Sequence, residues 1–429
     1  MLNHRLIDHL ERSHPAVAQV FRKYQNTTLR DYSRILFDYN SKKLESELIQ
    51  SFQDEWKALG LSKEEIEKAS TQLKKNPVLQ TGHHITPTLG PTFLALDLIS
   101  CAGLEKNQIY LVGANSGVAF SNTAWTGALS FGSIPMENLL NTEHPKFHKA
   151  LISAAERKSH GATENRISLI PSSQRDQLVF GSTICSTTID QYNLLSENLQ
   201  TIIPKPVASE PYSYWASKTC AVIQKRVLQH KQLLIFDINK VINRYLVRVL
   251  SSVQDHPVKQ ILFKSSTRNK IEQIFQNPVM FLGSYKGKKS FKVDPLTWND
   301  EGLTSSKSGA VATTSDELVE GLINDKYCPG VFLVFLILRF INGLRCLGSF
   351  NQLEYMETFR KNWQTLNNGW RFNLEPESAF SLTTGRMEID GKEMWPLDLA
   401  VKNETLLIEN FLEMEMGSLW EPILKHLTN

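Results

Sequence analysis

The residues best suited to chemistry lie in one polar insert, TGHHITPTLGP, at positions 81–91. A short apolar run precedes it and a segment of helical periodicity follows at 93–99, so the insert lies where a strand leads into a helix. His83 and His84 can exchange protons near neutral pH or donate to an anion. Because successive side chains of an extended chain diverge, we expect one histidine in a site and the other in its support. Hydrogen bonding of both rings to nearby backbone explains the pair equally well.

Small residues around the histidines point to a ligand at the same place. Glycine lets the backbone approach a ligand closely, and threonine can cap the helix that follows. We therefore expect Thr81, Gly82 and Thr86 to bind substrate. Gly90, at the start of that helix, is expected to bind a phosphate, because helix N-termini attract anions.

Two further predicted strands also end in polar residues. The sequence IYLVGANSGVAFSN at 109–122 places Asn115, Ser116 and Ser121 after an apolar run, as substrate-binding candidates or as an ordinary turn. The sequence LLIFD ends at Asp237, a candidate catalytic group that could meet an amine, a ribose hydroxyl or a metal ion. Capping of the following helix is the alternative role of Asp237.

Two later loops complete the candidates. Lys264, Ser265 and Arg268 precede a helix and suit phosphate or nucleotide binding, although a surface helix start has the same composition. After the most apolar run of the chain come three polar residues that we expect in the wall of a substrate pocket, with a loop entering an amphipathic helix as the alternative. These are Arg345, Gln352 and Glu354.

The order of elements predicts an α/β fold with a Rossmann-like, mostly parallel sheet, a helical N-terminal region and helical insertions. Buried strands are expected at 78–79, 109–112, 167–170 and 233–236, and helices at 93–101, 144–157, 216–228 and 241–250. The domain organisation follows: a helical region at 1–75, the α/β core at 76–282, a flexible loop or linker at 283–315, and a mainly helical region at 316–429 that completes the core.

Composition narrows the functional class. The net charge of +3 is too small to indicate a protein that binds nucleic acid through its overall positive charge. The most apolar run is too short to span a membrane. Five widely spaced cysteines without a Cys-x-x-Cys pair favour a reducing cytoplasm over disulfides or zinc, and the histidine spacing suggests no metal site. Neither a phosphate-loop motif nor a Gly-x-Ser-x-Gly elbow occurs.

The opening insert resembles a segment of the cysteine-adding enzymes of bacillithiol biosynthesis. Those enzymes carry Thr-Gly-Gln-Gln, then Gly-Pro-x-Tyr, then a helix with an Ile-Ser pair; here the counterparts are TGHH at 81–84, GPTF at 90–93 and IS at 99–100. The resemblance implies a core like that of the class I nucleotidyltransferases and a ligase or transferase reaction. One departure is the stretch NSGV at 115–118, where the family has an acidic, histidine-containing motif.

These observations lead to three hypotheses. The first is an enzyme that joins an amine, thiol or amino acid to a small acceptor, with His83, His84 and Asp237 as catalytic residues and with ATP or another nucleotide as the candidate cofactor. The second is a nucleotidyltransferase that activates a small acid. The third is a non-catalytic binding protein of a biosynthetic or effector complex. Small-molecule substrates and a homodimer are the partners we consider.

Overall fold

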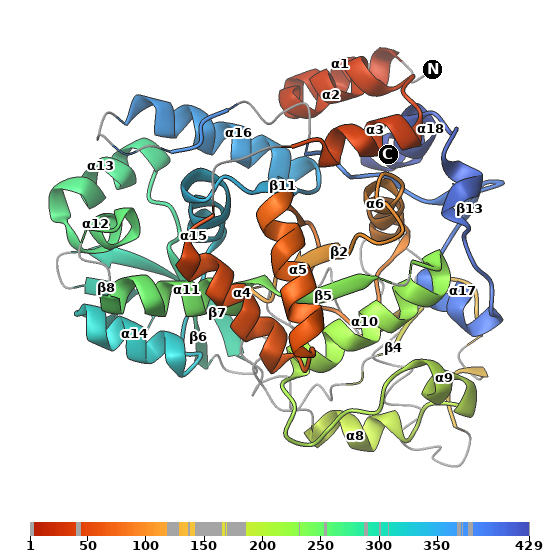
Figure 1. Ribbon diagram of the computed structural model, residues 1–429, viewed down its shortest axis with the longest axis horizontal. Coiled ribbons are helices and arrows are strands. Elements are labelled where there is room, and N and C mark those ends of the chain that lie inside the picture. The colour runs from red at the N-terminus through yellow and green to blue at the C-terminus, as the bar shows by residue number, and fades with distance from the viewer. Residues whose placement is uncertain are drawn as a thin grey trace.

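The computed structural model describes most of the chain. The described residues are 4–39, 44–117, 128–135, 138–141, 165–167, 169, 186–230, 232–252, 255–286, 291–299, 302–307, 309–366, 370, 372–375 and 381–428. Within them lie a four-stranded parallel sheet between helices and a separate five-stranded antiparallel sheet (Figure 1).

Helices make up the described N-terminal region, as expected from its periodicity. They are α1 (His4–Ser13), α2 (Pro15–Tyr24), α3 (Leu29–Phe37), α4 (Ser46–Ala58) and α5 (Lys63–Lys75). A capping box starts α5: the Ser62 hydroxyl accepts from Glu65 N–H, and the Glu65 carboxylate accepts from Ser62 N–H. Both ends of the chain lie at the same end of the molecule, where α1 and α2 contact the C-terminal α18 (Met416–Thr428).

The parallel sheet has the order β11-β1-β2-β5. Its strands are β1 (Val78–Gln80), β2 (Tyr110–Ala114), β5 (Leu233–Asp237) and β11 (Arg345–Leu347). The helices that follow its first three strands are α6 (Pro91–Cys101), α10 (Tyr212–Leu228) and α11 (Ile238–Ser252). The mixed α/β class with a parallel sheet is therefore confirmed, and β1, β2, β5 and these helices lie where periodicity placed them.

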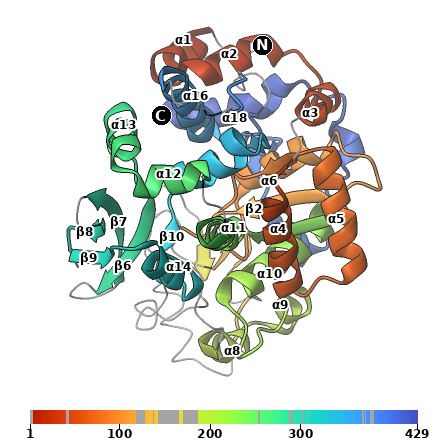
Figure 2. The ribbon, with the colours of Figure 1, turned by 60° about the vertical axis from the view of Figure 1, so that its left-hand side comes forward.

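Alternating residues of the strands feed two apolar cores, one on each face. Val78 and Val112 pack with α6 and α10, whereas Leu79 and Leu111 pack with α4, α5 and α11. This arrangement explains why the strands read as continuous apolar runs, since both faces of a parallel sheet are covered. Figures 1 and 2 show α6 and α11 near the two sides of the sheet.

Strand order reverses beside β1. The chain adds β2 and β5 on one side of β1 and later returns to add β11 on the other. The loops after β1 and β11 therefore leave the same carboxyl edge in different directions, which is where ligands bind in open α/β sheets. The short strand β11 was not predicted because its sequence Arg-Cys-Leu, between Leu344 and Gly348, does not form an uninterrupted apolar run.

The segment 283–315 is not a linker as far as it is described. It forms most of an antiparallel sheet, from β6 (Phe281–Lys286) through β7 (Phe291–Asn299) and β8 (Gly302–Ser305) to β9 (Gly309–Ala312), with β10 (Cys328–Pro329) beside β6. In β7 the buried Leu296 and Trp298 alternate with the exposed Pro295 and Thr297. The many glycine, serine and lysine residues of this segment hid the pattern in the sequence. Figure 2 shows the sheet on the far side of α11 from α5 and α6.

The remaining elements surround these two sheets. They are β3 (Leu129–Phe131), β4 (Asn165–Ile167), α8 (Ser186–Tyr192), α9 (Glu197–Ile202), α12 (Pro257–Phe263), α13 (Ser265–Phe275), α14 (Ser315–Ile323), α15 (Val331–Phe335), the π-helix η4 (Leu336–Ile341), α16 (Phe350–Thr365), β12 (Glu388–Ile389), β13 (Lys392–Glu393), α17 (Pro396–Lys402) and the 3-10 helix η5 (Ile408–Phe411). The expected strand at 167–170 corresponds to β4, which ends at Ile167 and pairs antiparallel with β3 outside the parallel sheet. The expected helix at 144–157 lies outside the described residues.

Gly103 permits close packing between α3 and the end of α6. A Cβ added there would lie 2.6 Å from the carbonyl carbon of Ser33 and 2.8 Å from the nitrogen of Arg34. Gly103→Ala is therefore expected to lower the free energy of unfolding by about 1–3 kcal/mol, because backbone atoms must move. Denaturant unfolding measures the change. Lys106→Ala, exposed in the same connection, is the control, and equal stability of both variants would contradict this packing.

Candidate functional site

The backbone after β1 is held against the end of β2 with a shift in register. Gln80 pairs with Val112, but His84 pairs with Asn115, so the β1 side carries one extra residue. Asn115 N–H donates to the carbonyl of His83 at 2.7 Å, and Ile85 N–H donates to the carbonyl of Asn115 at 3.0 Å. Such a bulge re-aims side chains at the end of a strand. Both histidines are thereby fixed to the carboxyl edge of the sheet.

Gly82 lets this backbone pass close to β11. Its N–H donates to Gln80 Oε1 at 2.8 Å, and a Cβ at Gly82 would lie 3.2 Å from the Cα of Gly348. Glycine is therefore required by chain packing at the switch in strand order, and its expected contact with substrate is not needed to explain it.

His83 is bound to a carboxylate of α6. Its Nε2 lies 2.8 Å from Asp97 Oδ1, and Tyr110 OH donates to the same oxygen at 2.8 Å. The side chains of His83 and Asp97 are each 1% exposed. A carboxylate only accepts, so this contact favours a hydrogen on Nε2 of His83 over one on Nδ1. That Nδ1 is buried and has no hydrogen-bond partner in the part of the chain that the structure describes.

His84 is half-buried beside its neighbour and differs from it in environment. Both rings lie edge-on to Phe93 in the first turn of α6, with centroids 5.3 Å away for His83 and 6.4 Å for His84. Burial, reinforced by the charge of His83, lowers the pKa of His84 to about 4. His84 is therefore neutral at pH 7 and offers no positive charge to an anion.

Asp237 joins the ends of β2 and β5. Its Oδ1 accepts from the hydroxyl of Ser116 at 2.8 Å and from the N–H groups of Asn239 at 3.0 Å and Lys240 at 3.4 Å. Ser116 N–H in turn donates to Asn239 Oδ1 at 2.9 Å. Burial raises the pKa of Asp237 to about 6. Asp237 thus takes the capping role at the start of α11, and its buried Oδ2 has no partner among the described residues.

Thr81 and Gln352 contact each other. Gln352 Nε2 donates to Thr81 Oγ1 at 2.8 Å and to the carbonyl of Cys346 at 3.0 Å. Thr81 Oγ1 donates to the carbonyl of Leu347 at 3.0 Å. These side chains, expected to bind substrate, tie β1 to β11 and α16 at the same carboxyl edge.

Gly90, expected to contact a phosphate, packs against an aromatic ring. Gly90 is the N-cap of α6, but the ring of Trp395 covers it, since an added Cβ would lie 3.3 Å from Trp395 Cζ3. The helix N-terminus is therefore packed against an indole. Thr86 donates to the carbonyl of Thr88 at 2.8 Å within the same loop.

Arg345 and Glu354 hold helix ends and do not meet at one pocket. Arg345 Nη1 donates to the carbonyls of Ile35 and Leu36 at 2.9 and 2.8 Å, at the C-terminal end of α3. Glu354 Oε1 accepts from Val17 N–H at 3.0 Å in the first turn of α2. Both are charge-assisted caps, which explains these side chains without a substrate; their place in a pocket wall stays a prediction.

The predicted phosphate loop also lies apart from the histidines. Lys264 is the N-cap of α13, Ser265 begins that helix, and the buried Arg268 donates to the carbonyl of Leu262 at 3.5 Å. Figures 1 and 2 place α12 and α13 away from α6 and β2. These residues therefore form a helix corner outside the candidate site. Ser121 lies outside the described residues.

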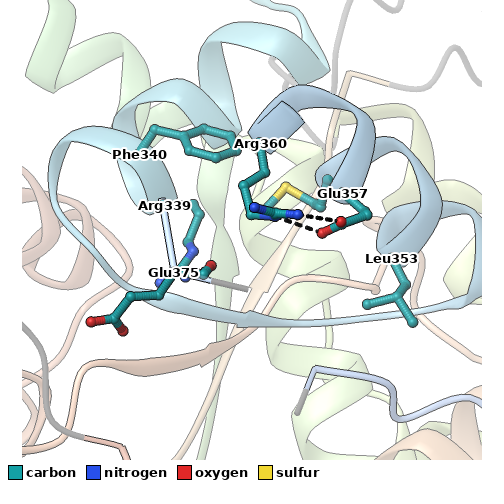
Figure 3. A pocket seen from close by; sticks show the side chains of 7 residues that line it. Arg339, Phe340, Leu353, Glu357, Arg360 and Glu375 are labelled. Carbon is teal, nitrogen blue, oxygen red and sulfur yellow. Dashed lines mark hydrogen bonds and ion pairs between the residues drawn. The ribbon is translucent and has the colours of Figure 1, made fainter. Parts of the chain in front are cut away.

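A hollow beside α16 is too small for a substrate. It is lined by Arg339, Phe340, Leu353, Met356, Glu357, Arg360 and Glu375 (Figure 3). Arg360 Nε donates to Glu357 Oε2 at 2.8 Å, so those two charges satisfy each other. The room inside is about 10 Å³, which accommodates roughly one water molecule.

Sequence reasoning missed Asp97 and Tyr110. Asp97 is the one charged residue in the α6 sequence PTFLALDLISC, and an isolated acid in a buried apolar helix is the signal that could have found it. Tyr110 begins β2 and gave no comparable signal. The described residues contain no group of three His, Cys, Asp or Glu side chains placed to hold a metal ion.

Comparisons with known proteins returned no family model, no curated protein and no solved structure that matches the chain. Among the described residues, no helix has both the length and the apolarity required to cross a membrane.

Arg345→Met is expected to lower the free energy of unfolding by about 2–4 kcal/mol, because several carbonyls at the end of α3 lose a charged donor. Urea unfolding measures this. Arg22→Met, which removes exposed ion pairs with Asp8 and Glu11, should change stability by less than about 1 kcal/mol. Unchanged stability of the Arg345 variant would return that residue to the list of ligand contacts.

His84 should make stability depend on pH. Its pKa is about 4 in the folded chain against 6.5 as the ordinary value, so the unfolded chain binds the proton first. The contribution of the neutral His84 to the free energy of unfolding is fully present above pH 6.5. It is lost as pH falls toward 4, by up to about 3 kcal/mol. Asp237 and Glu55, whose raised pKa values are about 6 and 7, act in the opposite direction.

The difference in unfolding free energy between the wild-type chain and His84→Gln isolates this contribution, because both chains share the two acids. Between pH 7 and pH 4.5, we expect the free energy of unfolding of the wild-type chain to fall relative to that of His84→Gln. Urea melts at the two pH values measure this. Parallel pH profiles for the two chains would contradict a neutral, buried His84.

Proposed function

We propose that this chain is an enzyme that joins a small amine, thiol or amino acid to a small acceptor, and that His83 takes the proton released by the nucleophile. The observation that carries the proposal is the ring of His83, held by Asp97 at 2.8 Å, with a buried Nδ1 that lacks a partner in the described chain. Buried polar atoms are seldom left unpaired, so an unpaired one in a native site favours a role toward a ligand.

Proton transfer is better supported than anion binding. His84 is neutral at pH 7, Gly90 is covered by Trp395, and Lys264 lies at a separate helix corner. None of these three residues therefore favours a bound phosphate at this edge. A nitrogen base with a fixed tautomer instead suits removal of a proton from an N–H or S–H group.

Several other groups converge on the same edge of the sheet. Asn115 pairs with the backbone of His83, and its neighbour Ser116 donates to Asp237. Asp237 Oδ2 is a second buried acceptor without a described partner. In the proposed reaction Asn115 and Ser116 orient the acceptor, and Asp237 supports them.

The resemblance to cysteine-adding enzymes agrees with this reaction class and supports a cytoplasmic location within the same proposal. Buried thiols at Cys101, Cys220 and Cys328, free of disulfides, are consistent with a reducing compartment. Nucleotide use is tested by including nucleoside triphosphates among the candidate ligands.

The test begins with a thermal-shift screen against thiols, amines, amino acids, hydroxy acids, sugar phosphates and nucleotides. Ligands of the folded state raise its melting temperature by mass action. Stabilising compounds are then combined in pairs, and products are followed by mass spectrometry. His83→Gln is expected to slow product formation by about 10²–10⁴, the usual contribution of a general base, with ligand affinities changed only a few-fold.

His256→Gln is the matched control, because His256 is also buried and also contacts a tyrosine and a carboxylate. Its product formation should match that of the wild-type chain. Normal turnover by His83→Gln would overturn the assignment of the base. If no compound in the screen raises the melting temperature, a non-catalytic binding protein is favoured instead.

A further inference from the structure

Asp97 lies at the centre of a buried polar contact that the sequence did not reveal. Two donors meet its Oδ1, the Nε2–H of His83 and the hydroxyl of Tyr110, each at 2.8 Å. The surrounding residues of α6 are apolar and buried. An acid in such a place must be satisfied by strong hydrogen bonds, and here the imidazole supplies one of them.

We propose that Asp97 is a positioning residue that fixes His83 as the Nε2–H tautomer, so that Nδ1 is the basic atom at the carboxyl edge of the sheet. The use of this tautomer in proton transfer rests on the proposed function, whereas the tautomer itself can be observed without a substrate. A carboxylate bonded to one imidazole nitrogen sets which nitrogen is protonated and how the ring is oriented.

The proton balance of the step follows from this arrangement. The N–H or S–H bond of the nucleophile breaks, its proton forms a bond with His83 Nδ1, and the electron pair stays on the attacking atom. The ring then carries a positive charge that faces the carboxylate of Asp97 across the Nε2–H bond. No oxidant, reductant or metal is needed.

Tyr110 has a supporting role in the same contact. Its hydroxyl occupies a second lone pair of Asp97 Oδ1 and so restricts rotation of the carboxyl group. Removing that hydroxyl leaves the carboxylate next to His83. Tyr110→Phe therefore separates loss of the charge from general disturbance of the buried cluster.

The experiment is long-range ¹H–¹⁵N spectroscopy of the full chain labelled with ¹⁵N-histidine, with His83→Gln used to assign the resonances of His83. At pH 8 we expect a protonated Nε2 and an unprotonated Nδ1. His256 provides an internal reference for this tautomer, because its Nδ1 accepts from Val258 N–H at 3.2 Å.

Asp97→Asn is expected to shift the His83 population to the Nδ1–H tautomer, since the amide can donate to Nε2. Tyr110→Phe should keep the wild-type tautomer. Asp398→Asn, a buried acid on α17 that accepts from Ser133 N–H at 2.7 Å, controls for loss of a carboxylate elsewhere and should also keep it.

A protonated Nδ1 in the wild-type chain would overturn the proposal, as would an unchanged tautomer in Asp97→Asn. A shift of the same size in Tyr110→Phe would attribute the effect to the cluster and not to the carboxylate of Asp97. If the tautomer follows prediction but His83→Gln forms product at the wild-type rate, the proposed function fails while the positioning role stands.

Discussion

The contact between His83 and Asp97 is the interaction on which the candidate site depends. Both side chains are removed from water, and burial of a carboxylate is costly unless donors replace its hydration. The ring of His83 and the hydroxyl of Tyr110 supply such donors to Oδ1, while the buried Oδ2 has no partner among the described residues. In return the imidazole is held in one orientation and one tautomer, which a histidine on a mobile surface loop would lack.

The parallel sheet makes this contact possible. The crossover connection through α6 brings β1 and β2 side by side, and the register shift after Gln80 aims His83 back at that helix. Gly82 allows the same backbone to pass β11 closely. Asn115, Ser116 and Asp237 then reach the edge from the neighbouring strand ends.

Periodicity predicted the parts of the fold whose signal is local. The helices of the N-terminal region, the strands β1, β2 and β5, and α6, α10 and α11 follow from apolar spacing and capping residues. The antiparallel strands β6 to β9 were missed because glycine, serine and lysine are frequent in their sequence, and β11 was missed because Arg345 interrupts its apolar residues. Short or one-sided strands are defined by pairing between distant segments, which a single sequence does not display.

Site prediction had the same limit. The polar residues after the three strands do meet at one edge, since parallel strands end together. Arg345, Glu354 and Gly90 looked functional by type, yet the first two cap helices far away in sequence and the third accommodates an indole. Asp97 shows the converse, an acid hidden in an apolar helix whose role appears only when His83 is placed beside it.

The most direct test of His83 as the proton acceptor is a titration of the ¹⁵N-histidine-labelled chain with the compound that stabilises it most in the thermal-shift screen. We expect the Nδ1 resonance of His83 to move with occupancy, while the ring of the distant His256 stays unchanged. A saturating ligand that leaves His83 Nδ1 unmoved would contradict the claim that this nitrogen faces the ligand.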